Sequence, residues 1–232
     1  MKSWIGISLF ALLAFTACNT IGMTDAEVQA VQKVLDFYGG YCESHKGFET
    51  DNGETETYFE LQMSKSELIE NYSNMLALPA SNVAYLFYSN LKEGRDNYTY
   101  IKVKILLSEN QSYDFSYSVN DLSEVQNLVP VLQTASDKIK AQDYAGLIGL
   151  MDTSVSTSLT VGKLEAFCMP YDSAYGAVTQ TQFQGYSFFE SEKDQGTYAH
   201  IAGIMIREKQ NTPISVFIDR KSKKVMSMKY EF

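Results

Sequence analysis

Twice along this chain, apolar residues at the spacing of an α-helix give way to residues that alternate between apolar and polar, which is the period of a β-strand. Helices followed by strands predict an α+β unit, in which the helices pack on one face of a sheet. The strand-like segments that begin at Tyr98 and Tyr198 lie about 100 residues apart, a suitable length for a domain with one core. We therefore predict two tandem α+β domains, each with N-terminal helices on a curved antiparallel sheet of three to four strands.

The first half begins with a helix. Thr24 and Glu27 have the spacing of a capping box, and so do Ser64 and Glu67 at the start of a second helix. Between the two helices, the polar segment 47–56 predicts a loop. The strand-like segments of this half are 57–62, 83–89, 98–107 and 113–119.

The second half repeats this plan with little residue identity. Helical spacing recurs at 128–139 and 144–151, and Thr160 is placed to cap a third helix. A break near 120–126 places the first domain at 24–120 and the second at 121–232. The strand-like segments of the second half are 182–190, 198–207, 214–219 and 225–232.

Charge and composition exclude some function classes. The chain has 232 residues with 19 Lys and Arg against 28 Asp and Glu, a formal net charge of −9. A nucleic-acid-binding protein needs a surplus of Lys and Arg, so we expect no nucleic-acid partner. Apolar residues make up 45% of the chain, which is enough for a folded protein.

The N-terminus has the layout of a secretory signal peptide. Lys2 supplies the charge, and the uncharged, mostly apolar run 3–17 follows it. That run is shorter than the roughly 20 residues that a membrane-spanning helix needs. It ends in the sequence Phe15-Thr16-Ala17-Cys18, and polar residues follow at once.

These four residues resemble the lipobox of bacterial lipoproteins, although Phe15 stands where Leu is usual. The resemblance implies that residues 1–17 are removed, that Cys18 is acylated, and that 18–23 form a short linker. Two or three acyl chains would hold the protein stably on a membrane. Asn19 does not resemble the acidic retention signal of enteric bacteria, so we expect the outer membrane rather than the inner one.

The order of helices and strands resembles the nuclear transport factor 2-like, or cystatin-like, cone fold. Together with the lipobox, this order of elements implies a small exported lipoprotein with this fold. The resemblance lies in element order and not in a diagnostic motif, so it transfers no active-site residue to this sequence.

Two cysteines remain besides Cys18, one in each half. An exported protein can form disulfides, so Cys42 and Cys168 are a candidate pair; the alternative is two separate buried thiols. Together with His45 and His200 they also make up a formal Cys₂His₂ set, but only Cys42 and His45 have ligand spacing. We expect no metal ion and no cofactor.

His200 is the histidine on a predicted strand, and it is the candidate pocket residue. As a general base it would be oriented by Asp219 or Glu190, whereas a hydrogen-bonded structural role explains its position equally well. Both faces of its strand are rich in apolar residues, so alternation does not say which face is inward. Tyr100, beside Lys102 and Lys104, is the best candidate for an exposed aromatic ring.

No catalytic constellation emerges: the chain has no Gly-x-Ser-x-Gly elbow and no glycine-rich phosphate loop. The leading expectation is a membrane-anchored binding or assembly protein of the cell envelope, whose ligand or protein partner is open, rather than an enzyme. One alternative is a cone-fold isomerase, dehydratase or hydrolase with its cavity in the second domain. Another is an inhibitor or sensor that presents a sheet edge.

Overall fold

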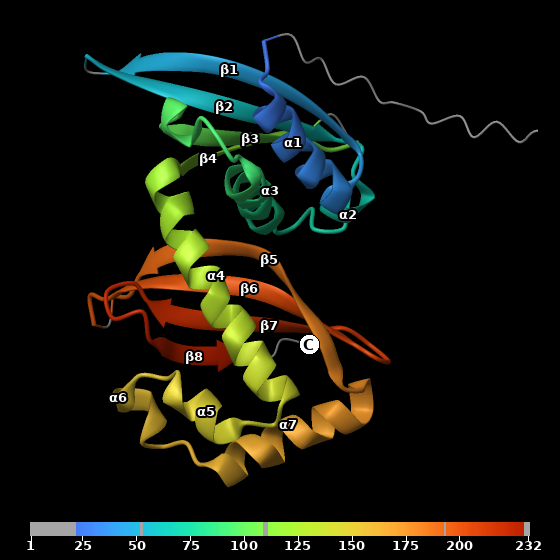
Figure 1. The fold of residues 1–232 in the computed structure, drawn as a ribbon, viewed down its shortest axis with the longest axis vertical. Coiled ribbons are helices and arrows are strands. Elements are labelled where there is room, and N and C mark those ends of the chain that lie inside the picture. Colours follow the sequence, from blue (N-terminus) through green and yellow to red (C-terminus); the bar gives the residue numbers. More distant parts are fainter. Residues whose placement is uncertain (1–21, 52, 109–110, 193, 230–232) are drawn as a thin grey trace, which may run out of the picture.

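A computed structural model describes residues 22–51, 53–108, 111–192 and 194–229. The predicted signal peptide, Cys18 and the last three residues lie outside the described residues. The described chain forms two units, each a four-stranded sheet with helices on it (Figure 1). The prediction of an α+β fold with two sheet-plus-helix units is confirmed.

The first unit has helices α1 and α3 on one face of its sheet (Figure 1). Its strands lie in the order β1-β2-β3-β4. In chain order its elements are α1 (Asp25–Tyr38), β1 (Tyr41–Asp51), β2 (Glu54–Ser64), α2 (Glu67–Glu70), α3 (Ala77–Asn90), the 3₁₀ turn η1 (Arg95–Asn97), β3 (Tyr100–Leu106) and β4 (Ser112–Ser118).

The second unit begins with a long helix that packs on β5, β6 and β7. Its four strands form an antiparallel meander in the order β5-β6-β7-β8. Its elements are α4 (Val119–Lys140), α5 (Tyr144–Gly149), α6 (Thr153–Ser156), α7 (Val161–Tyr175), β5 (Val178–Glu190), β6 (Thr197–Arg207), β7 (Thr212–Asp219) and β8 (Val225–Lys229).

Helix α4 carries the chain from the first sheet to the second. Its N-cap, Ser118, is also the last residue of β4, and its length brings it across the second sheet (Figure 1). Residues 120–126, where the sequence suggests a break, belong to this helix. The two units are therefore joined by a continuous element rather than by a loop.

The first sheet is mixed, whereas the sequence predicts an antiparallel one. Strands β2 and β3 are parallel, because α2 and α3 lie between them in the chain and return it to the starting edge. Parallel neighbours need such a crossover, which here is helical.

Two further predictions of the first half are wrong. Residues 83–89 belong to α3 and not to a strand. They are apolar on all sides because α3 is buried between α1, the first sheet and the second unit, and a helix buried all round loses its amphipathic pattern. Of the expected loop, residues 47–51 and 54–56 belong instead to the ends of β1 and β2, which form a hairpin with an exposed, mostly polar outer part.

The predicted helix starts hold in part. Thr24 and Glu27 form the complete capping box of α1. The cap of α2 is Ser66 rather than Ser64, because the Ser66 side chain accepts a hydrogen bond from the backbone N–H of Ile69. The predicted caps and strands of the second half agree with the structure within a few residues.

The two units are packed tightly against each other through α3 and β5. Ser81 of α3 is fully buried, and its Oγ accepts a hydrogen bond of 2.8 Å from the backbone N–H of Tyr186. Gly185 has a φ of 151°, and an added Cβ there would collide with the carbonyl oxygen of Leu78. Glycine at this position lets the two backbones approach closely.

Candidate functional site

The two faces of the second sheet differ in what covers them. One face packs under α4 and is built from fully buried aliphatic residues, among them Ile201, Val216 and Ile218. The residues that alternate with these point to the opposite face, and many are aromatic or carry a hydroxyl group. We call this second surface the open face: Ser187, Phe189, Tyr198, His200, Ala202, Ile204, Pro213, Ser215, Phe217, Ser227 and Lys229.

Four rings make continuous contact along the open face. The Phe189 ring stacks on Tyr198 with 5.6 Å between centroids and meets the edge of Phe217 at 6.1 Å. Phe217 in turn stacks on His200 at 4.8 Å, with only 13° between the ring planes. Phe189 is 40% exposed, so this aromatic row reaches solvent. A row of rings on a sheet face that no described helix covers is a surface suited to binding.

Polar or charged groups contact two of these rings, Tyr198 and Phe217. The Tyr198 hydroxyl donates a hydrogen bond of 2.7 Å to Asp194, and this bond is the main reason that the pKa of Tyr198 is raised. The same bond is the first cause of the lowered pKa of Asp194. The ammonium group of Lys229 lies 5.0 Å from the centre of the Phe217 ring. A hollow of about 350 Å³ lies over this end of the row.

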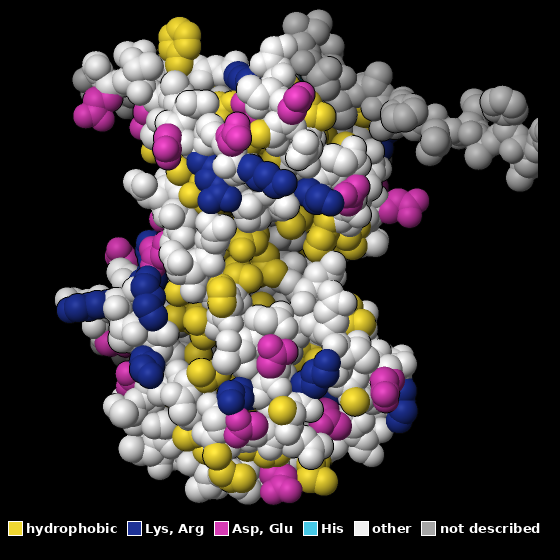
Figure 2. Space-filling model, viewed as in Figure 1, with side chains coloured by type: hydrophobic (Ala, Val, Ile, Leu, Met, Phe, Trp, Pro, Cys, Tyr) yellow, Lys and Arg dark blue, Asp and Glu magenta, His cyan; other side chains and the backbone are white. Residues whose placement is uncertain are grey.

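A pocket of about 420 Å³ adjoins the other end of the row, at the junction of the two units. Its walls come from the open face and from the α2–α3 connection of the first unit, and none of the described residues that line it is Asp, Glu, Lys or Arg. Figure 2 shows hydrophobic side chains at the waist where the units meet. The lining includes Tyr72, Met75, Leu78, Gln184, Ser187, His200, Ala202, Ile204, Pro213 and Ser215.

His200 lies where the pocket meets the aromatic row. Its Nε2 atom is 2.8 Å from Ser215 Oγ. Asp219, one of the two carboxylates considered for orienting it, accepts a hydrogen bond from the backbone N–H of Ser222 in the turn after β7. His200 thus lines a pocket, with a serine hydroxyl as its hydrogen-bond partner there.

The corresponding face of the first sheet carries ion pairs. Lys102 pairs with Glu49 at 2.5 Å, and Lys104 pairs with Asp114 at 3.3 Å. Tyr100 lies on this face, and Glu56 is the first cause of the raised pKa of its hydroxyl. Ion pairs of this kind are typical of a solvated surface. The contrast marks the open face of the second sheet, and not the face that carries Tyr100, as the candidate site.

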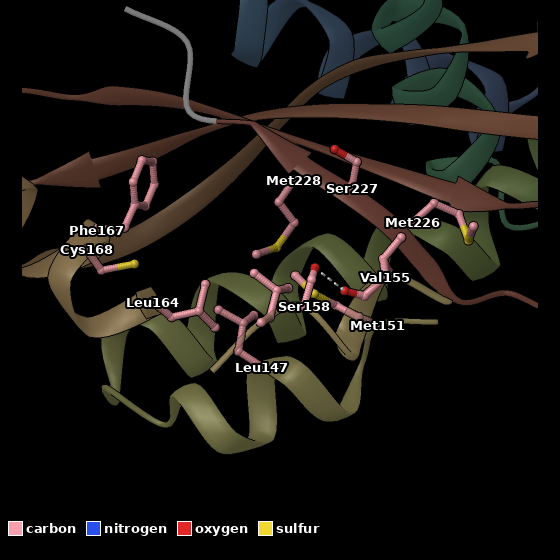
Figure 3. Close-up of a pocket in the computed structure, with 11 residues that line it drawn as sticks. Leu147, Met151, Val155, Ser158, Leu164, Phe167, Cys168, Met226, Ser227 and Met228 are labelled. Carbon is pink, nitrogen blue, oxygen red and sulfur yellow. Dashed lines mark hydrogen bonds between the residues drawn. The ribbon is translucent and has the colours of Figure 1, made fainter. Parts of the chain in front are cut away.

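A smaller apolar pocket, about 270 Å³, lies between α5, α6, α7 and β8 (Figure 3). Its walls include three methionines and the buried Cys168, and its one drawn hydrogen bond joins Ser158 Oγ to the carbonyl of Val155. Methionine is the residue that fills irregular gaps, so we interpret this pocket as loose packing of the short helices.

The candidate cysteine pair does not form a disulfide. Cys42 lies in β1 of the first unit and Cys168 in α7 of the second, and both are buried thiols that form no disulfide bond. Within the described ranges no group of three or more His, Cys, Asp or Glu residues is arranged to hold a metal ion. In the same ranges no helix is long and apolar enough to cross a membrane.

The chain matches no protein-family model, and neither a curated protein nor a solved structure is significantly similar to it.

Sequence reasoning found His200 but missed Phe189 and Phe217. A signal was present on β6: the face of Ala199, Ile201 and Gly203 has no polar side chain, whereas the alternating face has Tyr198 and His200. The purely apolar face is the one that a helix covers. The other face, with Tyr198 and His200, is then expected to point toward solvent.

Proposed function

We propose that this chain is an exported protein, anchored to a bacterial membrane through acyl chains on Cys18, that binds a ligand on the open face of its second sheet. The observation that carries the binding function is the aromatic row beside an uncharged pocket. In this proposal each unit has the cone-like form implied by its element order, and the protein belongs to the outer membrane.

The connection to the first unit supports this arrangement. Lys46 donates a hydrogen bond of 2.8 Å to the carbonyl oxygen of Gly22 and forms an ion pair of 2.6 Å with the buried Glu27. These contacts fix the start of the described chain on the first unit. Cys18 is four residues earlier, and four residues span at most about 14 Å. The acyl chains would therefore hold the first unit near the membrane and leave the second unit free to meet its ligand.

The anchor is tested by intact-mass analysis of the membrane fraction without reduction. We expect a mature chain from Cys18 with added acyl mass, and we expect Cys18→Ala to abolish both the added mass and the membrane association. Thr20→Ala, two residues beyond the acylation site, is the matched control and should keep both. An unmodified wild-type protein in the soluble fraction would contradict the anchor.

A hydrolase is the second candidate function, because Ser215 Oγ lies 2.8 Å from His200 Nε2 inside a pocket. This is the distance of a serine nucleophile from its general base. Two features favour binding over catalysis. Ser215 is only 3% exposed, and it pairs with Ala202 and Lys229 in the middle of the sheet, where ladder bonds occupy the backbone N–H groups that an oxyanion hole needs.

The two candidates are separated by a fluorophosphonate probe, which labels activated serines. Binding without catalysis predicts that Ser215 is not labelled in the native protein. The His200→Ala variant should likewise show no labelling of Ser215. Labelling that disappears in both Ser215→Ala and His200→Ala would support the hydrolase instead.

A further inference from the structure

We propose that the ligand of the open face is an uncharged oligosaccharide; this inference rests on the binding function proposed above. The exposed ring of Phe189 offers a flat apolar surface to solvent, and its stacked contact with Tyr198 and edge contact with Phe217 hold it in the row. A pyranose ring has apolar C–H faces and a rim of hydroxyl groups. It therefore needs a flat aromatic ring under it and short polar side chains around it.

Short polar side chains stand beside the rings in register. Ser187, His200, Phe217 and Ser227 face one another across all four strands of the sheet. Two serine hydroxyls thus flank the stacked pair formed by His200 and Phe217, and Gln184 adds an amide in the adjoining pocket. Hydroxyl, amide and imidazole groups both donate and accept hydrogen bonds, as sugar hydroxyls do.

The charges near the row favour a neutral ligand. Asp194 is engaged by the Tyr198 hydroxyl and by the backbone N–H of Gly196, and Asp219 by the turn that contains Ser222. Lys229 is the cation beside the row, and it lies over the Phe217 ring. A ligand rich in phosphate or carboxylate groups needs a cluster of Lys and Arg, which the described residues that line these two hollows do not supply.

The edges of the second sheet disfavour a peptide that binds as an added strand. The β5 edge lies against α3 of the first unit. At the β8 edge, Val225 exchanges hydrogen bonds with the backbone of Leu150 and Asp152. Strand addition needs an edge with free N–H and C=O groups, and these contacts occupy part of both edges, which favours a ligand that reaches this sheet through its face.

The length of the surface fits several sugar units. His200 lines the junction pocket and Phe217 lines the hollow at the far end, and the two rings are stacked. The two hollows therefore lie on either side of this stacked pair on the open face. Each is within the roughly 300–1,000 Å³ of small-molecule sites, so a linear chain can occupy both.

The test is calorimetry of the purified acylated protein in detergent with defined glycans. Neutral probes are hexamers of glucose, xylose, mannose and N-acetylglucosamine, and the anionic probes are heparin and hyaluronan fragments. We expect one neutral hexamer to bind more tightly than its disaccharide and the anionic probes not to bind. Phe217→Ala should weaken binding about tenfold, the usual scale of one aromatic contact.

Two further variants separate a loss of binding from a loss of folding. Phe189 is at the solvent-exposed rim, so Phe189→Ala should keep the fold and still weaken binding. Tyr100→Ala on the first sheet is the matched control and should leave binding unchanged. Equal loss in Tyr100→Ala, or no binding of any neutral glycan, overturns the oligosaccharide assignment.

The same variants distinguish this failure from failure of the binding function. If a peptide or lipid binds instead and Phe189→Ala abolishes that binding, the oligosaccharide assignment is wrong while the proposed function stands. If the open face is unaffected by every bound probe, as measured by hydroxyl-radical modification of its rings, both are contradicted.

Discussion

The backbone N–H of Tyr186 donates a hydrogen bond to the side chain of Ser81, which lies 105 residues earlier in the chain. Ser81 Oγ also donates to the carbonyl of Leu78, so one buried hydroxyl joins helix α3 of the first unit to strand β5 of the second. This junction forms one wall of the candidate pocket. The pocket therefore depends on the two units remaining packed together.

The close approach at Gly185 is the first test of the junction. Gly185→Ala would place a Cβ against the carbonyl of Leu78 and requires a φ of 151° that alanine rarely adopts. We expect a loss of about 2 kcal/mol or more in the free energy of unfolding. Gly162→Ala is the control, since it lies in α7 with open space around it and should stabilise by up to about 1 kcal/mol. Equal losses in urea denaturation would contradict the packing described at the junction.

Two buried tyrosines provide a matched pair. The Tyr186 hydroxyl is buried and has no hydrogen-bond partner among the described residues, and burial raises its pKa. Tyr186→Phe should therefore be neutral or slightly stabilising, because it removes an unsatisfied polar group. Tyr38 accepts a hydrogen bond of 2.9 Å from Asn82, so Tyr38→Phe should cost about 1 kcal/mol. Thermal denaturation of both variants checks the difference, and a larger loss in Tyr186→Phe would contradict it.

Because of Glu27, the free energy of unfolding of the first unit should depend on pH in the acid range. Burial raises the pKa of its carboxyl, but hydrogen bonds from Lys46, Tyr98 and the backbone of Thr24 outweigh burial and lower it below 4.5. Since the folded pKa is the lower one, the stabilisation is present above the unfolded pKa and is lost as the pH falls through the folded pKa.

Glu27→Gln tests this dependence. The variant should lower the free energy of unfolding by about 1–3 kcal/mol at pH 7. It should also lose less of its remaining stability than the wild type does when the pH falls from neutral to below 4.5, the pKa of a free carboxyl. Asp36→Asn changes an exposed carboxylate on the same helix and should alter both quantities far less. An unchanged acid dependence in Glu27→Gln, measured by urea denaturation at several pH values, would contradict the role of this network.

The state of Cys42 and Cys168 is directly measurable. Both are buried thiols outside any disulfide bond, so iodoacetamide without a reductant should add no mass to the native protein and two adducts to the denatured protein. Buried thiols react slowly because the reactive thiolate is disfavoured and the reagent is excluded. Denatured protein that takes up no reagent until a reductant is added would establish a disulfide instead.

The sequence predicts the second unit well and the first unit poorly. In the second unit β5, β6 and β7 each have one face under α4 and one open face, so local patterns and final structure agree. In the first unit, α3 is buried on all sides, and its residues 83–89 lose the period that would identify them as helical. The outer part of β1 is exposed, so it has the polar composition of a loop although it is paired with β2 along its length.

The candidate site was only half accessible to sequence reasoning. His200 could be selected because it is the histidine on a predicted strand, and the structure places it in a pocket. The row that it joins depends on register, since Phe217 is its cross-strand partner and Phe189 pairs with Tyr198. Register is set by turns and bulges, such as the irregularity between Phe183 and Gly185, which spacing in a single sequence does not reveal.

The most direct test of the central claim is hydroxyl-radical footprinting of the anchored protein in its own membranes, compared with the purified protein. Ligand binding on the open face predicts that Phe189, Tyr198 and Phe217 are modified several-fold less in the membranes, while Tyr58 and Tyr100 on the first sheet are modified equally in both. Equal modification of the open-face rings in the two samples would contradict the account.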